Sequence, residues 1–416
     1  MTRARHSVRP VRRRLLRGLW GAVAGVTGFV LTYVGTNAVL VQRAFDTHDI
    51  SSLLGHDPVS TVVADDAPTE EAEPTDFASG EALNILLIGS DERTDPDSGD
   101  GDVEGMRGDT TLVLHISKDR ERIDVVSIPR DLRTAIPSCR FYDGSTSYAR
   151  TDKFNAALMI GGRNGDLGEA AACVMTTVAE TTGVEFGGHF MMVDFEGFTG
   201  MVDAIDGVPM CITEYMYSKD AHLELQAGAQ VLHGKDALAF ARARKGIGLG
   251  GTGTDLARIE RQQELLTNTA RKVLGLNYLT NAPALTQFIR AGAESLSMDT
   301  ELGSLKNLIG LAYSLRGFDT KNLHFYTVPW HYPGDGTSDV VVTEPAATET
   351  WQAIIADQPI TTAEENVTQS PEPSAAPSPT GSATPDASAD PTPTATAGPR
   401  RETQKEILDA CNLPAG

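Results

Sequence analysis

The chain has 416 residues and a formal net charge of −21. Seven arginines lie within the first 17 residues, so that without them the remainder carries −28. A body this acidic excludes general nucleic-acid binding, which requires a basic surface to neutralise phosphates. Any phosphate chemistry must therefore depend on a local cluster of arginines.

The N-terminal segment predicts a membrane anchor. Residues 1–17 (MTRARHSVRPVRRRLLR) are basic and contain no acid, and residues 18–42 carry no charge. As a helix, the uncharged segment is long enough to cross a bilayer of roughly 30 Å. Basic residues before a span predict a cytoplasmic N-terminus, which places the rest of this single-pass cell-membrane protein outside the cytoplasm. A cleaved signal peptide is the alternative, but its apolar region usually has only about 7–15 residues.

The middle of the chain predicts an α/β layered domain. Residues 43–80 are acidic and polar and are expected to form an extracytoplasmic stalk, with the domain following over residues 81–360. Apolar runs predict strands over residues 83–89, 111–116, 123–128 and 323–329. Helices are expected over residues 153–159, 167–182, 195–205, 256–274 and 349–356. Strands that alternate with helices are typical of an α/β fold.

The C-terminal part changes in composition. Residues 361–400 are dominated by Pro, Ser, Thr and Ala, which predicts a disordered linker, and residues 401–416 regain helical character. An even number of cysteines on the exported side favours two disulfides among Cys139, Cys173, Cys211 and Cys411. Three pairings are possible. Cys139–Cys173 with Cys211–Cys411 is preferred, because the first two cysteines flank one candidate insertion.

Arginines and aspartates gather at the predicted strand ends, where sites in α/β sheets are usually built. Asp91 and Arg93 follow the first strand, and Arg107 and Asp109 precede the second. The dipeptide Arg130–Asp131 follows the third strand. Solvated loop charge is the alternative for any single pair, but three repeats of the pattern indicate a site.

The stretch ARARKGIGLGGTGTDLARIERQQELL (241–266) adds further candidates. Arg242 and Arg244 precede the glycines, and Asp255, Arg258 and Gln262 fall on one face of the helix that follows. The start of that helix offers free N–H groups to an anion.

Two features of the same stretch are expected to have no role in binding. Arg261 is interpreted as an ordinary solvated arginine. Gly248–Gly253 fits G-x-G-x-x-G, but charged residues precede it and no acid follows about 20 residues later. The match is therefore interpreted as chance in a mobile loop, and no nucleotide cofactor is expected.

The chemistry of these residue types indicates a lipid-linked pyrophosphate. Arginines bind phosphate oxygens bidentately, and paired aspartates bind Mg²⁺. No convincing nucleophilic triad is present, and the scattered histidines are expected to be structural or at the surface, namely His115, His189, His222 and His233. Core packing is the expected role of Phe190–Val202, with the lining of a polyprenyl tunnel as the alternative.

In seven ordered motifs the chain resembles the LytR-CpsA-Psr family of cell-wall glycopolymer ligases. The motifs are NILLIGSDER (84–93), RGDTTLVL (107–114), VVSIPRDL (125–132), DKFNAAL (152–158), VDFEGFTGMVDAIDGV (193–208), LHGKDALAFARARK (232–245) and DLARIERQQ (255–263). The paired cysteines are similar to those of the actinobacterial branch. The resemblance implies a central mixed sheet flanked by helices, with a hydrophobic tunnel for lipid.

The resemblance also implies a reaction and its residues. A glycan-1-phosphate would pass from polyprenyl pyrophosphate to a hydroxyl of peptidoglycan. Asp91 and Asp109 would hold Mg²⁺ (or Mn²⁺), and Arg93 belongs to the motif with a less defined role. The pyrophosphate would be bound by Arg107, Arg130, Arg242, Arg244, Arg258 and Gln262. Asp131 and Asp255 are the candidate general bases, with Asp91 as a third if the metal is absent.

Two departures and three alternatives stay open at this stage. An acidic insert, DPDSGDGDVEG (95–105), separates Asp91 from Asp109, and the loop over residues 246–253 is unusually rich in glycine. The same chemistry could serve a surface-protein acceptor. Lipid binding or pyrophosphate hydrolysis is a second alternative, and a purely structural anchor is a third.

Overall fold

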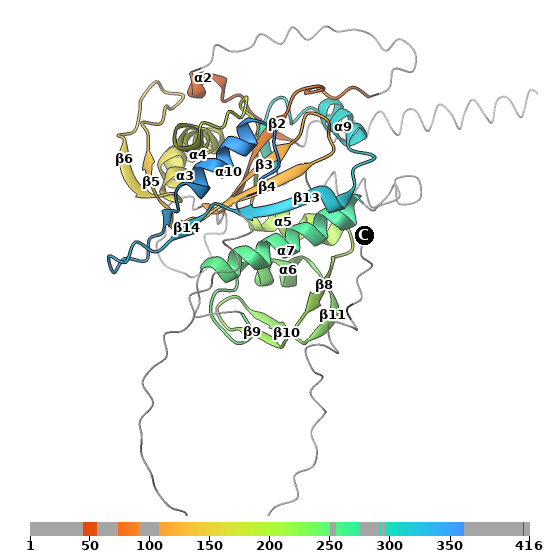
Figure 1. Ribbon diagram of the computed structural model, residues 1–416. Helices are drawn as coiled ribbons and strands as arrows, with labels where there is room; N and C mark the ends of the chain where they lie inside the picture. The colour runs from red at the N-terminus through yellow and green to blue at the C-terminus, as the bar shows by residue number, and fades with distance from the viewer. Residues whose placement is uncertain are drawn as a thin grey trace, which may run out of the picture.

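The computed structural model describes residues 45–55, 74–90, 108–249, 255–274, 292, 296–361 and 411. Its centre is a seven-stranded sheet in the order β1-β12-β7-β2-β3-β4-β13 (Figure 1). The strands are β1 (Asp46–His48), β12 (Leu296–Asp299), β7 (Phe190–Val193), β2 (Leu83–Ser90), β3 (Gly108–Ile116), β4 (Ile123–Ile128) and β13 (Leu323–Thr327).

The sheet is mixed, as expected. β2, β3 and β4 form an antiparallel meander, whereas β7 runs parallel to β2 and β13 parallel to β4. The register pairs Ser90 with Gly108 and Thr111 with Ile128. The ends of β2, β4, β7 and β13 and the start of β3 therefore share one edge, which we call the charged edge.

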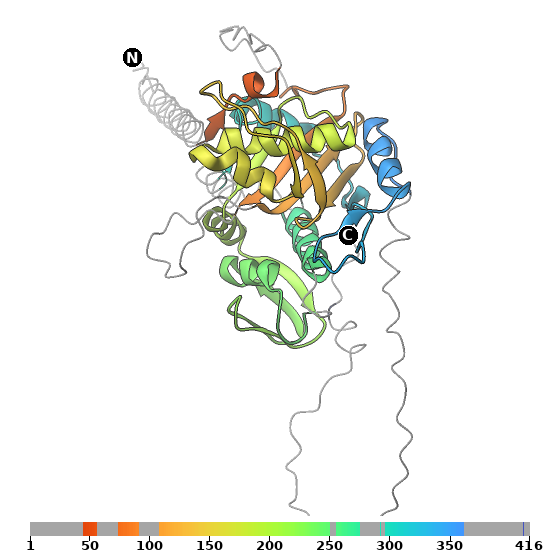
Figure 2. The ribbon, with the colours of Figure 1, turned by 90° about the vertical axis from the view of Figure 1, so that its left-hand side faces the viewer.

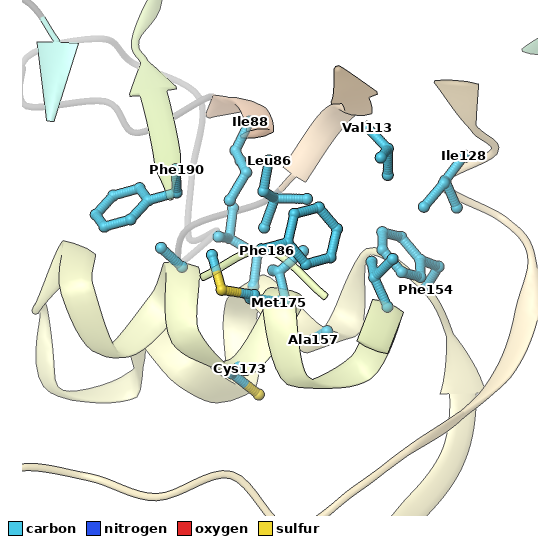
Figure 3. Close-up of a cluster of buried hydrophobic side chains, with 14 of the residues drawn as sticks. Leu86, Ile88, Val113, Ile128, Phe154, Ala157, Cys173, Met175, Phe186 and Phe190 are labelled. Atoms are coloured by element: carbon cyan, nitrogen blue, oxygen red, sulfur yellow. The ribbon is translucent and has the colours of Figure 1, made fainter. Parts of the chain in front are cut away.

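Helices cover both faces of this sheet. On one face lie α3 (Ala156–Gly161), α4 (Leu167–Thr182) and α10 (Ala346–Ile355). Figure 3 shows Leu86, Ile88 and Val113 pointing from the strands towards α3 and α4. On the other face lie α5 (Phe195–Ala204), α7 (Asp255–Leu274) and α9 (Leu305–Ser314).

Alternation along the strands divides the core between the two faces. In β2, Leu86 and Ile88 pack against α3 and α4, whereas Leu83 and Ile85 belong to the cluster on the opposite face. Successive side chains of a strand point to opposite faces. Both faces are covered, so the strand reads as a continuous apolar run rather than as an alternating one.

A smaller lobe follows α5. It consists of β8 (Val208–Ile212), β9 (Met216–Ser218), β10 (Leu223–Leu225), β11 (Gly228–Leu232) and α6 (Gly234–Arg242), and it has its own apolar cluster. Figure 2 shows this lobe (green) on the side of the sheet opposite α3 and α4 (yellow). Two short hairpins complete the fold, β5 (Arg133–Ile136) with β6 (Arg150–Lys153) and β14 (Trp330–His331) with β15 (Val341–Val342).

Local signals explain where the longer helices begin. Asp166 accepts a 2.8 Å hydrogen bond from the Glu169 N–H at the start of α4, and Asp194 accepts one of 2.7 Å from the Gly197 N–H at the start of α5. The expected helix over residues 153–159 is wrong at its N-terminal end. Residues 150–153 form β6 instead, because pairing with β5 prevails over local helix propensity.

The preferred disulfide pairing is confirmed. Cys139 is bonded to Cys173, and Cys211 is bonded to Cys411. Figure 3 shows the sulfur of Cys173 on the side of its helix that faces away from the sheet.

Several expected segments lie wholly or partly outside the described residues. These are the basic segment 1–17, the span 18–42, most of the stalk and the linker over 361–400, while Cys411 alone is described from the last segment. Within the described part of the chain, no helix is long and apolar enough to cross a membrane. Some of the expected stalk is folded, because residues 46–48 pair with β12 and Ile50 and Leu53 are buried in the core.

Candidate functional site

The dipeptide Arg130–Asp131 lies at the charged edge, directly after β4. Its backbone is held on both sides: Arg130 O accepts a 3.0 Å bond from the Asn155 N–H, and Asp131 O accepts one of 3.1 Å from the Val340 N–H. The Asp131 carboxylate lies 2.8 Å from Lys153 Nζ and 3.6 Å from Arg130 Nε. These contacts fix both side chains where the sequence placed a candidate site.

Asp131 is ionised under ordinary conditions. Burial alone would raise the pKa of this carboxyl, but the hydrogen bond from Lys153 and the charges of Arg130 and Arg244 lower it below its usual range. The influence of Arg244 shows that the segment after α6 reaches this edge. Strand β4 and the small lobe therefore contribute charge to one place.

A second layer of charge supports Asp131. Lys153 Nζ also lies 3.5 Å from Asp339, whose carboxylate is 3.0 Å from the guanidinium of Arg133. Arg133 in turn lies 2.9 Å from Asp335, so that the loop between β14 and β15 is bound to the segment after β4. Lys153 and Asp339 were not predicted as site residues, although Lys153 lies within the motif DKFNAAL.

An apolar cavity of about 310 Å³ opens between the sheet and α5, α6 and α7. Met191 and Val193 line it, whereas Phe190 and Met192 of the same strand are buried in the core on the other face. Core packing is therefore confirmed for Phe190 and Met192, whereas Met191 and Val193 line this cavity. The polar side chains that line the cavity include Arg242, Arg258 and Gln262.

Helix α7 carries two of these polar residues on one face, as expected. Arg258 and Gln262 are four residues apart, which places them one turn apart on the same side of the helix. Gln262 donates a 3.1 Å hydrogen bond to Ala241 O, and the Arg242 guanidinium lies 4.4 Å from the centre of the Phe195 ring. The cavity thus combines apolar walls with the side chains of two arginines, a glutamine and Asp194.

The expectation of a solvated Arg261 is wrong. This side chain is only 6% exposed, and its guanidinium donates hydrogen bonds to the carbonyl oxygens of Phe240, Ala243 and Leu249. Arg261 therefore joins α7 to the end of α6 and to the segment that carries Arg244. The helical spacing could not identify it, since its partners are backbone groups remote in sequence.

The glycines after α6 have a structural role. A Cβ at Gly246 would overlap the carbonyl oxygen of Tyr217 in β9, and one at Gly248 would overlap that of Tyr215, just before β9; the φ of Gly248 is +68°. The backbone also pairs with β9 through Tyr217 and Ile247. Residues 246–249 are therefore packed and not a mobile loop, and the glycines are required by close backbone approach. Residues 250–254 lie outside the described part.

The structure describes only some of the expected metal and base candidates. Asp91, Arg93 and Arg107 lie outside the described residues. Asp109 is placed by its backbone near the start of β3, and Asp255 is placed by its backbone as the first residue of α7. Among the described side chains, no group of three His, Cys, Asp or Glu residues is arranged to hold a metal ion.

The order of these parts along the chain corresponds to a known family. Residues 55–355 match the LytR_cpsA_psr family, which is more than half of the chain. The chain belongs to this family. The resemblance seen in the seven motifs is thereby confirmed.

Curated relatives of this LytR_cpsA_psr chain come from several bacteria. LcpB of Corynebacterium glutamicum, a probable cell wall biosynthesis protein, is 32% identical over 260 residues, which cover 60% of this chain and 51% of LcpB. LcpA of the same organism, a cell wall biosynthesis protein, is 29% identical over 283 residues, which cover 63% of this chain and 52% of LcpA. The chain thus spans about half the length of these two relatives. TagU of Halalkalibacterium halodurans, a polyisoprenyl-teichoic acid–peptidoglycan teichoic acid transferase, is 27% identical over 266 residues. These residues cover 61% of this chain and 76% of TagU.

Solved structures agree with the fold of the LytR_cpsA_psr chain. A LytR-Csp2A-Psr enzyme from Actinomyces oris aligns with a TM-score of 0.50 at 16% identity, over 68% of this chain and 96% of that one. A protein from Streptococcus agalactiae aligns with a TM-score of 0.51 at 19% identity, over 68% and 90%. At these identities the likeness shows the fold, a mixed sheet flanked by helices.

Proposed function

We propose that this protein is a membrane-anchored phosphotransferase that acts outside the cytoplasm. It transfers a glycan-1-phosphate from a polyprenyl-pyrophosphate carrier to peptidoglycan. The acceptor hydroxyl oxygen attacks the phosphorus that carries the glycan, the phosphoanhydride bond breaks, and polyprenyl phosphate leaves with the bridging oxygen. The hydroxyl proton passes to a base, and a phosphodiester joins glycan to acceptor.

The observation that carries this proposal is an apolar cavity lined in part by arginines, beside a charged strand edge. An isoprenoid chain requires apolar walls such as Met191 and Val193, and a pyrophosphate requires cations such as Arg242 and Arg258. Arg258 is 2% exposed and near enough to Arg261 to lower the pKa of that guanidinium, which burial lowers most. Positive charge concentrated in an otherwise acidic chain favours an anionic ligand.

The remaining roles follow from the positions of the residues. Arg130 and Arg244, whose charges lower the pKa of Asp131, would bind the phosphate that is transferred, with Arg107 added from the motif before β3. Asp91, which follows Ser90 in the sequence, and Asp109 offer the hard oxygen ligands that Mg²⁺ or Mn²⁺ prefers. When bound, such an ion would neutralise charge on the departing phosphate.

The contacts of Asp131 favour a positioning role over that of general base. A carboxylate with a lowered pKa is a weaker proton acceptor, and one oxygen of Asp131 is already held by Lys153. Asp131 would orient Arg130 and Arg244, which leaves Asp255 at the start of α7 as the candidate base.

The test is release of polyprenyl phosphate by the full chain in lipid vesicles. The chain is supplied with Mg²⁺ and a polyprenyl-pyrophosphate glycan, either alone, with peptidoglycan oligomers, or with a candidate surface protein. We expect release that depends on peptidoglycan, with a loss of about 100-fold or more in Arg130→Ala and Arg244→Ala. Lys321→Ala, on a short turn before β13, is the matched loss of one positive charge and should leave the rate unchanged.

Each other result would replace the proposal with a different function. Release that requires the protein acceptor would change the reaction to protein glycosylation. Release that requires neither acceptor would indicate pyrophosphate hydrolysis. Binding of the lipid without release under any condition would leave a lipid-binding protein, and unchanged rates in both arginine variants would refute the phosphate-binding roles.

A further inference from the structure

A second open cavity lies on the opposite face of the sheet from the apolar one. It has a volume of about 530 Å³ and is bordered by β5, the C-terminal end of α4, the hairpin β14–β15 and α10. Figure 1 shows α10 close to β14, with β5 farther to the left beyond α3. We call it the α10 groove. None of the residues that line it belongs to those proposed to bind the lipid or the phosphate.

The α10 groove has an apolar floor and walls that carry mostly uncharged polar groups. Phe154 and Trp351 lie at the floor and are almost fully buried. The walls carry hydroxyl and amide groups, among them Thr134, Thr348 and Gln352. One cation and one anion also line it, Arg133 and Glu344, and the Arg133 guanidinium is paired with Asp335 and Asp339.

One face of α10 is shared between the core and this groove. Ala347, Thr348, Trp351, Gln352 and Ile355 recur at the spacing of a single helical face and all line the groove. A face turned towards the interior is normally apolar throughout. Thr348 and Gln352 are instead exposed, so the helix keeps hydrogen-bonding groups on the wall of an open cavity.

The α10 groove adjoins the residues proposed to bind the phosphate. Leu132 and Arg133 line it, and they follow Arg130–Asp131 directly. The wall beside them is fixed, because the Val340 N–H donates to Asp131 O and Val340 O accepts a 2.8 Å bond from the Arg133 N–H. The ion pairs of Arg133 hold the loop between β14 and β15 to the same segment.

We propose that the α10 groove binds the saccharide of the phosphate acceptor. Sugar rings present apolar C–H faces and many uncharged hydroxyl and amide groups, which match an apolar floor with hydroxyl and amide walls. Polar walls do not suit a polyprenyl chain. The only cation among the groove residues is already paired with two aspartates, which does not suit a polyanion. This inference rests on the proposed function and adds to it a location for the second substrate.

The test fills the groove from exposed positions, where a large side chain does not disturb the core. Thr348→Trp and Gln352→Trp each place an indole in the α10 groove. Glu349→Trp adds the same side chain at an exposed position of the same helix that does not line the groove. The rate of transfer to peptidoglycan oligomers is measured as a function of the acceptor concentration and, separately, of the lipid-donor concentration. Calorimetric titration with the disaccharide of N-acetylglucosamine and N-acetylmuramic acid measures binding directly.

We expect both groove variants to lower kcat/KM for the acceptor by about tenfold or more, while the KM for the lipid donor stays at its wild-type value. The disaccharide should bind to the wild type and to Glu349→Trp but not to the groove variants. Equal acceptor kinetics in all four proteins would overturn the inference. A wild type that releases no polyprenyl phosphate with any acceptor would instead refute the proposed function, and disaccharide binding would then still test the groove.

Discussion

Replacing Arg261 with methionine should destabilise the protein by about 3–5 kcal/mol. The guanidinium bonds to three buried carbonyl oxygens, those of Phe240, Ala243 and Leu249. Each hydrogen bond from a charged donor contributes about 1.5–3 kcal/mol to stability. The desolvation cost of burying the guanidinium, which the methionine variant does not have, must be subtracted from the sum of these contributions. Burial and the neighbouring Arg258 lower the pKa of Arg261, yet arginine stays protonated in proteins, so the donors are charged at neutral pH.

Urea unfolding followed by circular dichroism measures this loss. Arg271→Met, at an exposed position in the last turn of the same helix, removes an equal charge and should change the free energy of unfolding by less than about 0.5 kcal/mol. Because Arg261 also fixes the segment that carries Arg244, the proposed function predicts slower release of polyprenyl phosphate by the folded fraction of the variant than by the wild type. A destabilisation below about 1 kcal/mol, or equal to that of Arg271→Met, would refute the reasoning.

Three further changes test other contacts. Lys153→Met removes a hydrogen bond that lowers the pKa of Asp131. A carboxyl whose pKa is lower in the folded state stabilises the protein above its unfolded-state pKa, and this stability is lost as the pH falls through the folded-state pKa. The free energy of unfolding, measured with urea, should therefore fall less between neutral pH and about pH 3 in the variant than in the wild type. Gly248→Ala should lower the free energy of unfolding by about 1–3 kcal/mol in the same assay, because the φ of Gly248 is +68° and an added Cβ would have no room. Gly317→Ala is the control, since a Cβ there meets open space. Equal losses in the two variants would contradict the proposed close approach. Serine at both positions of Cys139–Cys173, which are 34 residues apart, should lower stability by roughly 4 kcal/mol, and an unchanged melting curve would show that this bridge does not constrain the unfolded chain.

Elements with a strong local signal were predicted well. α4 spans Leu167–Thr182 as expected, because an aspartate caps its start and a left-handed Gly183 ends it. Strand β4 also has the expected bounds, since all six of its residues are buried and four of them are Ile or Val. In such segments the local pattern and the tertiary packing favour the same structure.

Elements that depend on distant partners were not predicted. β6 exists because residues 150–153 pair with β5, and β1 exists because residues 46–48 pair with β12, about 250 residues later. The short strands of the small lobe, such as β9 and β10, have three residues each and carry no periodic signal. Pairing of this kind is decided by register in space and not by local composition.

The candidate site divides in the same way. Arg258 and Gln262 could be placed on one face from helical spacing, and Arg130 and Asp131 from their position after a strand. Lys153 is brought to Asp131 only by a hairpin, so no spacing in the sequence could indicate the contact. The α10 groove could not be predicted from the sequence either, because its walls are built by residues near 133, 181 and 348, which are far apart along the chain.

The bond between Cys211 and Cys411 closes residues 211–411 into a covalent ring, which contains α6, α7, β13 and α10. A single cut of the backbone anywhere inside this ring leaves both fragments in one molecule, with an unchanged mass on a non-reducing gel. Only reduction would separate them. A protease that cuts the main chain once between residues 211 and 411 would therefore release no fragment from the protein.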